Sequence, residues 1–170
     1  MTLSFTLSQG VITTDLPAFI VGIINVTEDS FWEGSRLRTM RKKSGLEFSN
    51  DANFAVDCAL DMVESGVDII DIGAESSRPG SSYIDEEEEI ARLVPIIQAI
   101  RKVSAVPISI DTRKKSVMQA AYEVGASMCN DISALQDDTS LASFVANKDL
   151  PIILMHKKGD PKTMQDKPVY

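Results

Sequence analysis

The sequence has little of what several classes of protein require. Its 170 residues include only two cysteines, Cys58 and Cys129, which are far apart and form no CxxC pattern. Neither a disulfide framework nor a zinc site is therefore indicated. The longest apolar run near the start, residues 19–24, is too short to span a bilayer and lacks the basic region of a signal peptide. These absences favour a protein of the reducing cytoplasm, with no membrane partner.

Basic charge is also scarce. The chain has 17 Lys and Arg against 25 Asp and Glu, a formal net charge of −8. A nucleic-acid surface needs clustered cations to neutralise phosphates, so nucleic acid is not expected as a partner. The one basic cluster lies at 36–43, in a loop-like stretch, and is interpreted as a solvated loop. The 44% hydrophobic content suits one ordinary domain with its own core.

Short apolar runs alternate with longer helical patterns, which is typical of repeated βαβ units. The runs are apolar throughout, as in strands covered on both faces of a parallel sheet. The predicted strands are 19–25, 67–73, 107–111, 126–132 and 151–156, and the predicted helices are 51–65, 85–103, 114–124 and 138–148. The count predicts an α/β fold, a partial TIM (β/α)8 barrel made of its first five βα units. A doubly wound open sheet is the competing architecture.

The helix predicted at 85–103 has the clearest signals. Asp85 is expected to cap it, with Glu88 completing a capping box and the acidic first turn favoured by the helix dipole. The acidic run is therefore interpreted as helix chemistry and not as a metal site. The predicted buried stripe consists of Ile90, Leu93, Val94, Ile97 and Ile100.

Each predicted strand ends in polar residues that can do chemistry. In order these are Asn25, Asp71 with Glu75, Asp111, Asn130 with Asp131, and His156. Functional groups gather at the carboxyl ends of strands in barrels and open α/β sheets alike. Five such endings in register predict a functional site at this edge of the sheet.

Two segments make a specific resemblance. N-V-T-E-D-S-F at 25–31 follows the first strand, and E-S-S-R-P-G at 75–80 follows the second. With I-S-I-D-T at 108–112, N-D-I at 130–132 and L-M-H at 154–156, the chain resembles the N-terminal portion of the dihydropteroate synthase family from about residue 19 to 170. The resemblance implies condensation of 6-hydroxymethyl-7,8-dihydropterin diphosphate with p-aminobenzoate to 7,8-dihydropteroate.

The resemblance also implies roles for individual residues in holding the pterin. Asp111 and Asn130 match the residues that hold the pterin ring, and Met155 matches one that packs on it. A carboxylate and a carboxamide suit this task, because one edge of a pterin presents a fixed pattern of donors and acceptors. His156, the single histidine, receives no role in the implied reaction.

A second group of residues is implied in binding the anionic parts of the substrates. Asn25 matches a ligand of Mg²⁺ near the diphosphate, which fits a cation that takes much of its coordination from phosphate and water. Arg78, beside Ser77, suits the diphosphate or the p-aminobenzoate carboxylate. Phe31 and Pro79 are expected to form apolar walls around the p-aminobenzoate ring. Asp111 and Arg78 are the catalytic candidates, in a mechanism of leaving-group neutralisation and positioning without a protein nucleophile.

The chain departs from the family pattern in three places. Glu28 replaces the proline of the first motif, the span 34–50 is longer than usual, and the sequence stops after the loop of the fifth strand. The residues that the family contributes from later strands are not present in this sequence. We therefore expect an incomplete domain over 1–170 that needs the remaining strands for full activity, with the family's homodimer possible only when they are present.

Two other functions remain open at this point. A methyltetrahydrofolate-binding methyltransferase domain also holds its pterin with an Asp and an Asn, although the two diphosphate-associated loops speak against it. A non-catalytic half-barrel partner is the other alternative.

Overall fold

The computed structural model describes residues 2–8, 10–26, 50–75 and 84–155. The fold opens with a hairpin in which β1 (Leu3–Leu7) pairs antiparallel with β2 (Gly10–Thr14). A five-stranded parallel sheet follows, made of β3 (Val21–Asn25), β4 (Ile69–Gly73), β5 (Ile108–Asp111), β6 (Met128–Asp131) and β7 (Ile152–Leu154). The described helices are α2 (Asn50–Glu64), α3 (Glu86–Arg101), α4 (Lys115–Glu123) and α5 (Ser140–Asn147).

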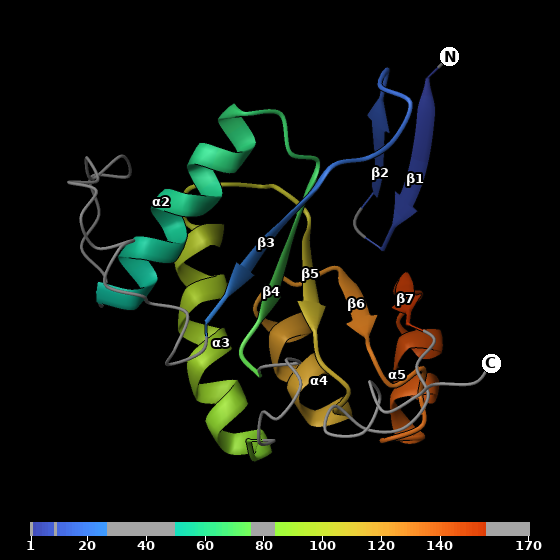
Figure 1. Ribbon diagram of the computed structural model, residues 1–170. Helices are drawn as coiled ribbons and strands as arrows, with labels where there is room; N and C mark the ends of the chain where they lie inside the picture. Colours follow the sequence, from blue (N-terminus) through green and yellow to red (C-terminus); the bar gives the residue numbers. More distant parts are fainter. Residues whose placement is uncertain (1, 9, 27–49, 76–83, 156–170) are drawn as a thin grey trace, which may run out of the picture.

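The strand order decides between the two predicted architectures. The order β3-β4-β5-β6-β7 follows the chain, with a helix between successive strands from β3 to β7 and every neighbouring pair parallel (Figure 1). A doubly wound sheet would reverse its order at a switch point, whereas a barrel adds each strand on the same side of the last. The partial barrel is thus confirmed over five strands and the four helices between them, and the doubly wound alternative is wrong.

The core lies between one face of the sheet and the helices. Ile24, Ile72, Ile110 and Cys129 are register partners from β3 to β6, and all are buried. They share one cluster with buried residues of the helices, among them Val56, Leu93, Ile97, Val117, Met118 and Leu141. Because side chains alternate along a strand, the next residues face the other side of the sheet. The helices therefore cover one face, and Asn25, Asp71, Asp111 and Asn130 belong to the other.

That second face is uneven in its exposure. The outer strands expose Ile23, at 61% of its surface, and Ile153, at 41%, whereas Asp71 and Ser109 on the strands between them are buried. The site residues therefore lie on the better-covered middle of this face.

Helix α3 confirms part of its sequence prediction and corrects the rest. The Asp85 side chain accepts a hydrogen bond from the Glu88 backbone N at 2.8 Å, as an N-cap does. Glu88 does not complete the capping box, because its carboxylate pairs with Arg92 one turn later. The buried stripe is also rotated, since Ile90 and Val94 are only half-buried. The residues buried instead are Glu89, Leu93, Ile96, Ile97, Ala99 and Ile100.

The hairpin β1–β2 was not among the predicted elements. Its strands are five residues each and mostly exposed, so the alternation of apolar and polar residues is short and weak. The ring of Phe5 packs near that of Phe19, with centroids 6.1 Å apart, which joins the hairpin to the segment leading into β3. Among the described helices, none is long and apolar enough to cross a membrane.

Candidate functional site

The carboxyl ends of β4, β5 and β6 bring three residues into one row. Gly73 pairs in register with Asp111, and Asp111 pairs with Asn130. Asp71 precedes Gly73 by two residues, so it lies on the same face one step deeper in the sheet. The row confirms that the strand-end residues of β5 and β6 meet, as the sequence predicts.

Asn130 and Asp71 are joined by a hydrogen bond across the row. The Nδ2 of Asn130 donates to Oδ2 of Asp71 at 3.1 Å. Because the amide nitrogen of Asn130 is directed at Asp71, the Oδ1 of Asn130 lies on the other side of its carboxamide. Asp71 is 5% exposed, and its Oδ1 has no partner among the described residues. A buried hydrogen-bond acceptor without a donor is unsatisfied, and a bound molecule can supply the missing donor.

Gly73 makes room for the Asp111 carboxylate. A Cβ placed on Gly73 would lie 3.2 Å from Cβ and 3.4 Å from Oδ2 of Asp111. Because glycine has none, the Asp111 side chain can pack directly over the backbone of β4. The glycine of the second predicted strand end therefore has a steric role in the site.

The surroundings of Asp111 make its charged form costly. Burial, followed by repulsion from Asp71, Glu89, Glu75 and Asp131, raises the pKa of Asp111 from 3.8 to about 7. A carboxyl group in this state takes up or releases a proton near neutral pH. Together with the Asn130 amide, it forms an edge that can match a heterocycle carrying both donors and acceptors.

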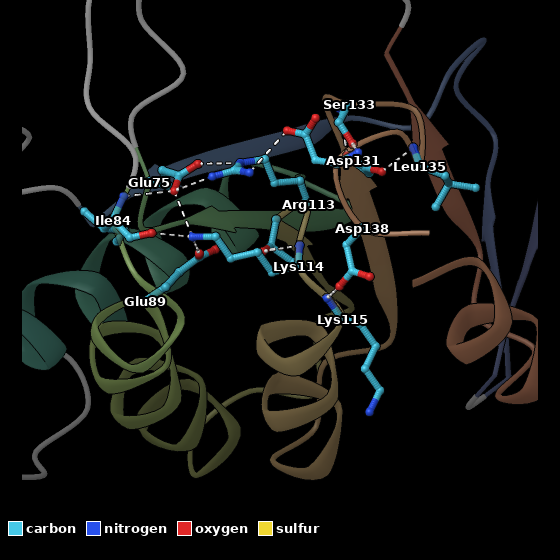
Figure 2. A network of polar contacts seen from close by, with 12 residues as sticks. Glu75, Ile84, Glu89, Arg113, Lys114, Lys115, Asp131, Ser133, Leu135 and Asp138 are labelled. Carbon is cyan, nitrogen blue, oxygen red and sulfur yellow. Dashed lines mark hydrogen bonds and ion pairs between the residues drawn. The ribbon is translucent and has the colours of Figure 1, made fainter. Parts of the chain in front are cut away.

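A network of ion pairs lies just beyond this row, in the turns that follow β4 and β5 (Figure 2). The Glu75 carboxylate accepts from Arg113 Nε at 3.0 Å and Nη2 at 3.3 Å, and from Lys114 Nζ at 2.9 Å. Lys114 Nζ also donates to Glu89 Oε2 and to the carbonyl of Ile84, both at 2.6 Å. Arg113 additionally pairs with Asp137 at 3.2 Å, in the turn after β6. The turns after three adjacent strands are thus tied together.

Glu75 and Lys114 shift each other's pKa. Burial alone would raise the pKa of Glu75, but its hydrogen bonds to Arg113 and Lys114 outweigh burial and lower it. Burial likewise opposes the charge of Lys114, whereas Glu89 and Glu75 raise its pKa. Both groups are therefore ionised at neutral pH.

Asp131 has a structural task, although the sequence groups it with the polar strand ends. Its Oδ1 accepts from the Ser133 backbone N and its Oδ2 from the Leu135 backbone N, both at 2.7 Å. Leu135 has a φ of 64°, in the left-handed region that ordinary side chains rarely adopt. The fully buried Asp131 carboxylate therefore holds an unfavourable turn in place.

The other predicted site residues are only partly within the described structure. Asn25 is exposed at the end of β3, beside Gly73 in register. Met155 follows β7 and is 38% exposed. Among the described residues there is no cluster of three or more His, Cys, Asp or Glu that could hold a metal ion. The remaining predictions, Arg78, Ser77, Phe31 and Pro79, lie outside the described residues, as do His156 and the basic cluster at 36–43.

Sequence reasoning missed two features of the site. Asp71 was noted as polar but not as a site residue, although its spacing of two from Gly73 places it on the same face. The sequence also does not identify Glu89 and Lys114 as part of the site. The signal was the position of Glu89 four residues before Leu93, which is on the buried stripe. A buried Glu predicts a buried cation, but the sequence does not name Lys114.

Comparisons with known proteins agree with this geometry. A family profile described as "Pterin binding enzyme" matches residues 21–170. A dihydropteroate synthase of Clostridium beijerinckii is 41% identical over 142 residues, covering 84% of this chain and 48% of that protein. The chain therefore spans about half the length of such relatives.

Solved structures give the same picture. A Xanthomonas albilineans dihydropteroate synthase with 4-aminobenzoic acid superposes with a TM-score of 0.71 at 38% identity, over 87% of this chain and 50% of that one. A Clostridium difficile dihydropteroate synthase in the presence of pteroic acid gives a TM-score of 0.73 at 38% identity, over 90% of this chain and 51% of that one.

Proposed function

Because the chain belongs to the family of pterin-binding enzymes, we propose that it forms the dihydropterin-binding part of a dihydropteroate synthase. The observation that carries this proposal is the row of Gly73, Asp111 and Asn130 at the carboxyl ends of adjacent strands, with Asp71 hydrogen-bonded to Asn130. The related structures with 4-aminobenzoic acid and with pteroic acid support p-aminobenzoate and a pterin as the substrate classes.

The row suits the amino-substituted edge of a dihydropterin. An ionised Asp111 carboxylate accepts two neighbouring N–H groups of that edge, as a carboxylate does from any paired donors. Asn130, with its Nδ2 fixed on Asp71, presents Oδ1 as an acceptor and its second amide hydrogen as a donor. Met155 then supplies an apolar surface for the ring. An analogue that lacks the edge leaves buried polar groups unpaired and is rejected.

The chemistry requires a leaving group and a positioned nucleophile. The C–O bond between the pterin methylene and the diphosphate breaks, and the diphosphate leaves with the electron pair. The aniline nitrogen forms the new C–N bond and loses a proton to water. Asp111 and Asn130 hold the methylene carbon at a fixed position, which converts the reaction into one between oriented partners. Arg78 is proposed as the cation that neutralises charge on an anionic end.

We further propose Mg²⁺ as the cofactor, with Asn25 as its protein ligand. Asn25 is an exposed carboxamide, and the described residues contain no acidic cluster that would form a closed cage. This donor set fits an ion that keeps several waters and binds mainly through diphosphate oxygens. When bound, such an ion supplies charge neutralisation for the leaving group.

The test is calorimetric binding of 6-hydroxymethyl-7,8-dihydropterin diphosphate to residues 1–170, with and without Mg²⁺. We expect binding that strengthens with Mg²⁺ and falls at least about 100-fold in Asp111→Ala, because a bidentate carboxylate contact is lost. Asn25→Ala should remove the Mg²⁺ dependence while keeping binding of the uncharged pterin alcohol.

Methyltetrahydrofolate serves as the competing ligand in the same assay. Binding of methyltetrahydrofolate without binding of the diphosphate would contradict the proposal and favour the methyltransferase alternative. Binding of neither ligand would contradict both.

A further inference from the structure

Glu75 joins two strand ends beyond the last pair of the sheet. The pairing of β4 with β5 ends at Gly73 and Asp111. Glu75 and Arg113 each lie two residues beyond this pair. The Glu75 carboxylate accepts hydrogen bonds from Nε and Nη2 of Arg113 and from Nζ of Lys114. A planar guanidinium that donates through two nitrogens fixes both the distance between the two side chains and their relative orientation. Contact between the two strands therefore continues past the sheet through side chains.

The same carboxylate also closes the connection that leads to α3. Oε2 of Glu75 accepts from the backbone N of Ile84 at 3.1 Å, and Lys114 donates to the backbone O of Ile84. Residues 75 and 84 are thus held at one place by one carboxylate and one ammonium group (Figure 2). The buried Glu89, at 1% exposure, holds Lys114 from the helix side. Each charge has at least one opposite partner, as buried ionic networks require.

The network begins two residues beyond Gly73 on β4 and two residues beyond Asp111 on β5. Asp111 packs over Gly73, two residues before Glu75, and precedes Arg113 by two residues. The two strands are thus joined by sheet pairing up to Asp111 and by the Glu75–Arg113 ion pair beyond it. On its other flank, the backbone N of Thr112 donates to the O of Asn130 at 3.0 Å.

We propose that Glu75 and Arg113 are positioning residues, which clamp the ends of β4 and β5 together and thereby hold the Asp111 carboxylate in its pterin-binding position. The inference rests on the proposed function. It adds two residues, Glu75 and Arg113, that do not contact the ligand. They set the position of Asp111, which binds the edge of the pterin.

The clamp also sets the charge around Asp111, which gives a readout that fold stability does not control. The acidic groups that raise the pKa of Asp111 are Asp71 from β4, Glu89 from α3, Glu75 from the turn after β4 and Asp131 from β6. The cations Arg113 and Lys114 partly offset Glu75 and Glu89. Removing Glu75 takes away a negative neighbour, whereas removing Arg113 leaves Glu75 less compensated. The two changes therefore move the ionisation of Asp111 in opposite directions.

The experiment measures binding of 6-hydroxymethyl-7,8-dihydropterin to residues 1–170 from pH 6 to 9. The alcohol is used because a diphosphate group would add its own titration. We expect Glu75→Gln and Arg113→Met each to weaken binding at pH 8.5 by about tenfold, as misplaced contact groups do. The pH at which binding is half its maximum should fall in Glu75→Gln and rise in Arg113→Met, each by about half to one pH unit. Arg113→Lys keeps the charge but not the fork, so it should weaken binding with an unchanged midpoint.

Arg101→Met is the matched control. Arg101 is a half-buried cation at the amino end of β5 and β6, where it donates to the carbonyls of Gly125 at 3.0 Å and Val106 at 2.6 Å. Its loss should lower the melting temperature without changing affinity or midpoint. Wild-type affinity and midpoint in both Glu75→Gln and Arg113→Met would overturn this inference but not the proposed function. So would a loss of affinity in Arg101→Met equal to that in the two clamp variants. No binding by the unmodified chain would overturn the proposed function with it. If Glu75→Gln does not fold, the two Arg113 variants decide the question.

Discussion

Asp111, the carboxylate proposed to bind the pterin, lies in surroundings that cost stability. Its carboxyl group is held among four other carboxylates, and its pKa is about 7 instead of 3.8. Under the proposed function this group binds its ligand in the ionised form, and its ionisation costs free energy while no ligand is bound. A ligand that donates hydrogen bonds to it removes part of that cost.

Asp111→Asn should therefore stabilise the fold at pH 8 while it abolishes dihydropterin binding. Because the folded pKa is raised, the stability associated with Asp111 is fully present below about pH 3.8 and is lost as the pH rises through 7. Asn removes the buried charge with little change of shape, and we expect a gain of about 1–3 kcal/mol in the free energy of unfolding at pH 8.

Thermal unfolding of the two proteins at pH 8, 5 and 4 measures this effect. The gain should shrink at pH 5 and nearly vanish at pH 4. A loss of stability at pH 8, or a gain that does not depend on pH, would show that Asp111 does not carry a costly charge.

Residue types at strand ends could be predicted, but their tasks could not. Asp111 and Asn130 were identified from their motifs and lie where expected. Asp131, next in the sequence, instead holds a turn with a left-handed residue. The difference arises because neighbouring residues of a strand face opposite sides, and the register that decides the sides is a long-range property.

At the scale of elements, the Asp138 carboxylate accepts hydrogen bonds from the first turns of two helices. Asp138 Oδ2 accepts from the Lys115 backbone N at 2.8 Å at the start of α4, which has no side-chain cap of its own. Its Oδ1 accepts from the backbone N of Ser140 at 3.0 Å at the start of α5. A single side chain thus satisfies exposed donors of two helix termini.

Asp138→Ala should cost about 1–2 kcal/mol of unfolding free energy, in line with the loss of helix caps. The hydrogen bond from the Ser140 side chain, together with the backbone donors, lowers the pKa of Asp138. Its stabilisation is therefore present above about pH 3.8 and is lost as the pH falls through the lowered value. Urea unfolding at pH 7 and pH 3 should show a difference from wild type that narrows in acid.

Asp138→Asn is the matched variant, because its carboxamide oxygen can replace only one of the two accepting atoms. We expect it to fall between wild type and Asp138→Ala. Equal stability of all three proteins at pH 7 would contradict the shared cap.

The start of helix α3 was predictable, and its orientation was not. Asp85 is a local N-cap, and the sequence identifies it correctly. The rotation of the buried stripe toward Glu89 depends on Lys114, 25 positions away, which compensates the buried carboxylate. Periodicity alone favours apolar residues such as Ile90, because it assigns no partner to a charge.

At the scale of the whole molecule, strand order is what turns scattered motifs into one site. The residues at 71–75, 111–114 and 130 are brought together only because β4, β5 and β6 are adjacent and parallel. Alternating βα patterns predict this order well, since successive parallel units add side by side. The N-terminal hairpin fell outside that pattern and was missed for the same reason.

The most direct test of the central claim is a map of backbone amide shifts of residues 1–170 on titration with 6-hydroxymethyl-7,8-dihydropterin at pH 8. If the carboxyl edge of β4, β5 and β6 binds the pterin, the shifts should concentrate at 71–75, 111–114 and 130–131. The hairpin β1–β2 and the residues near Arg101 should remain unchanged. Shifts centred on the amino ends of the strands, or no saturable shifts at all, would contradict the account.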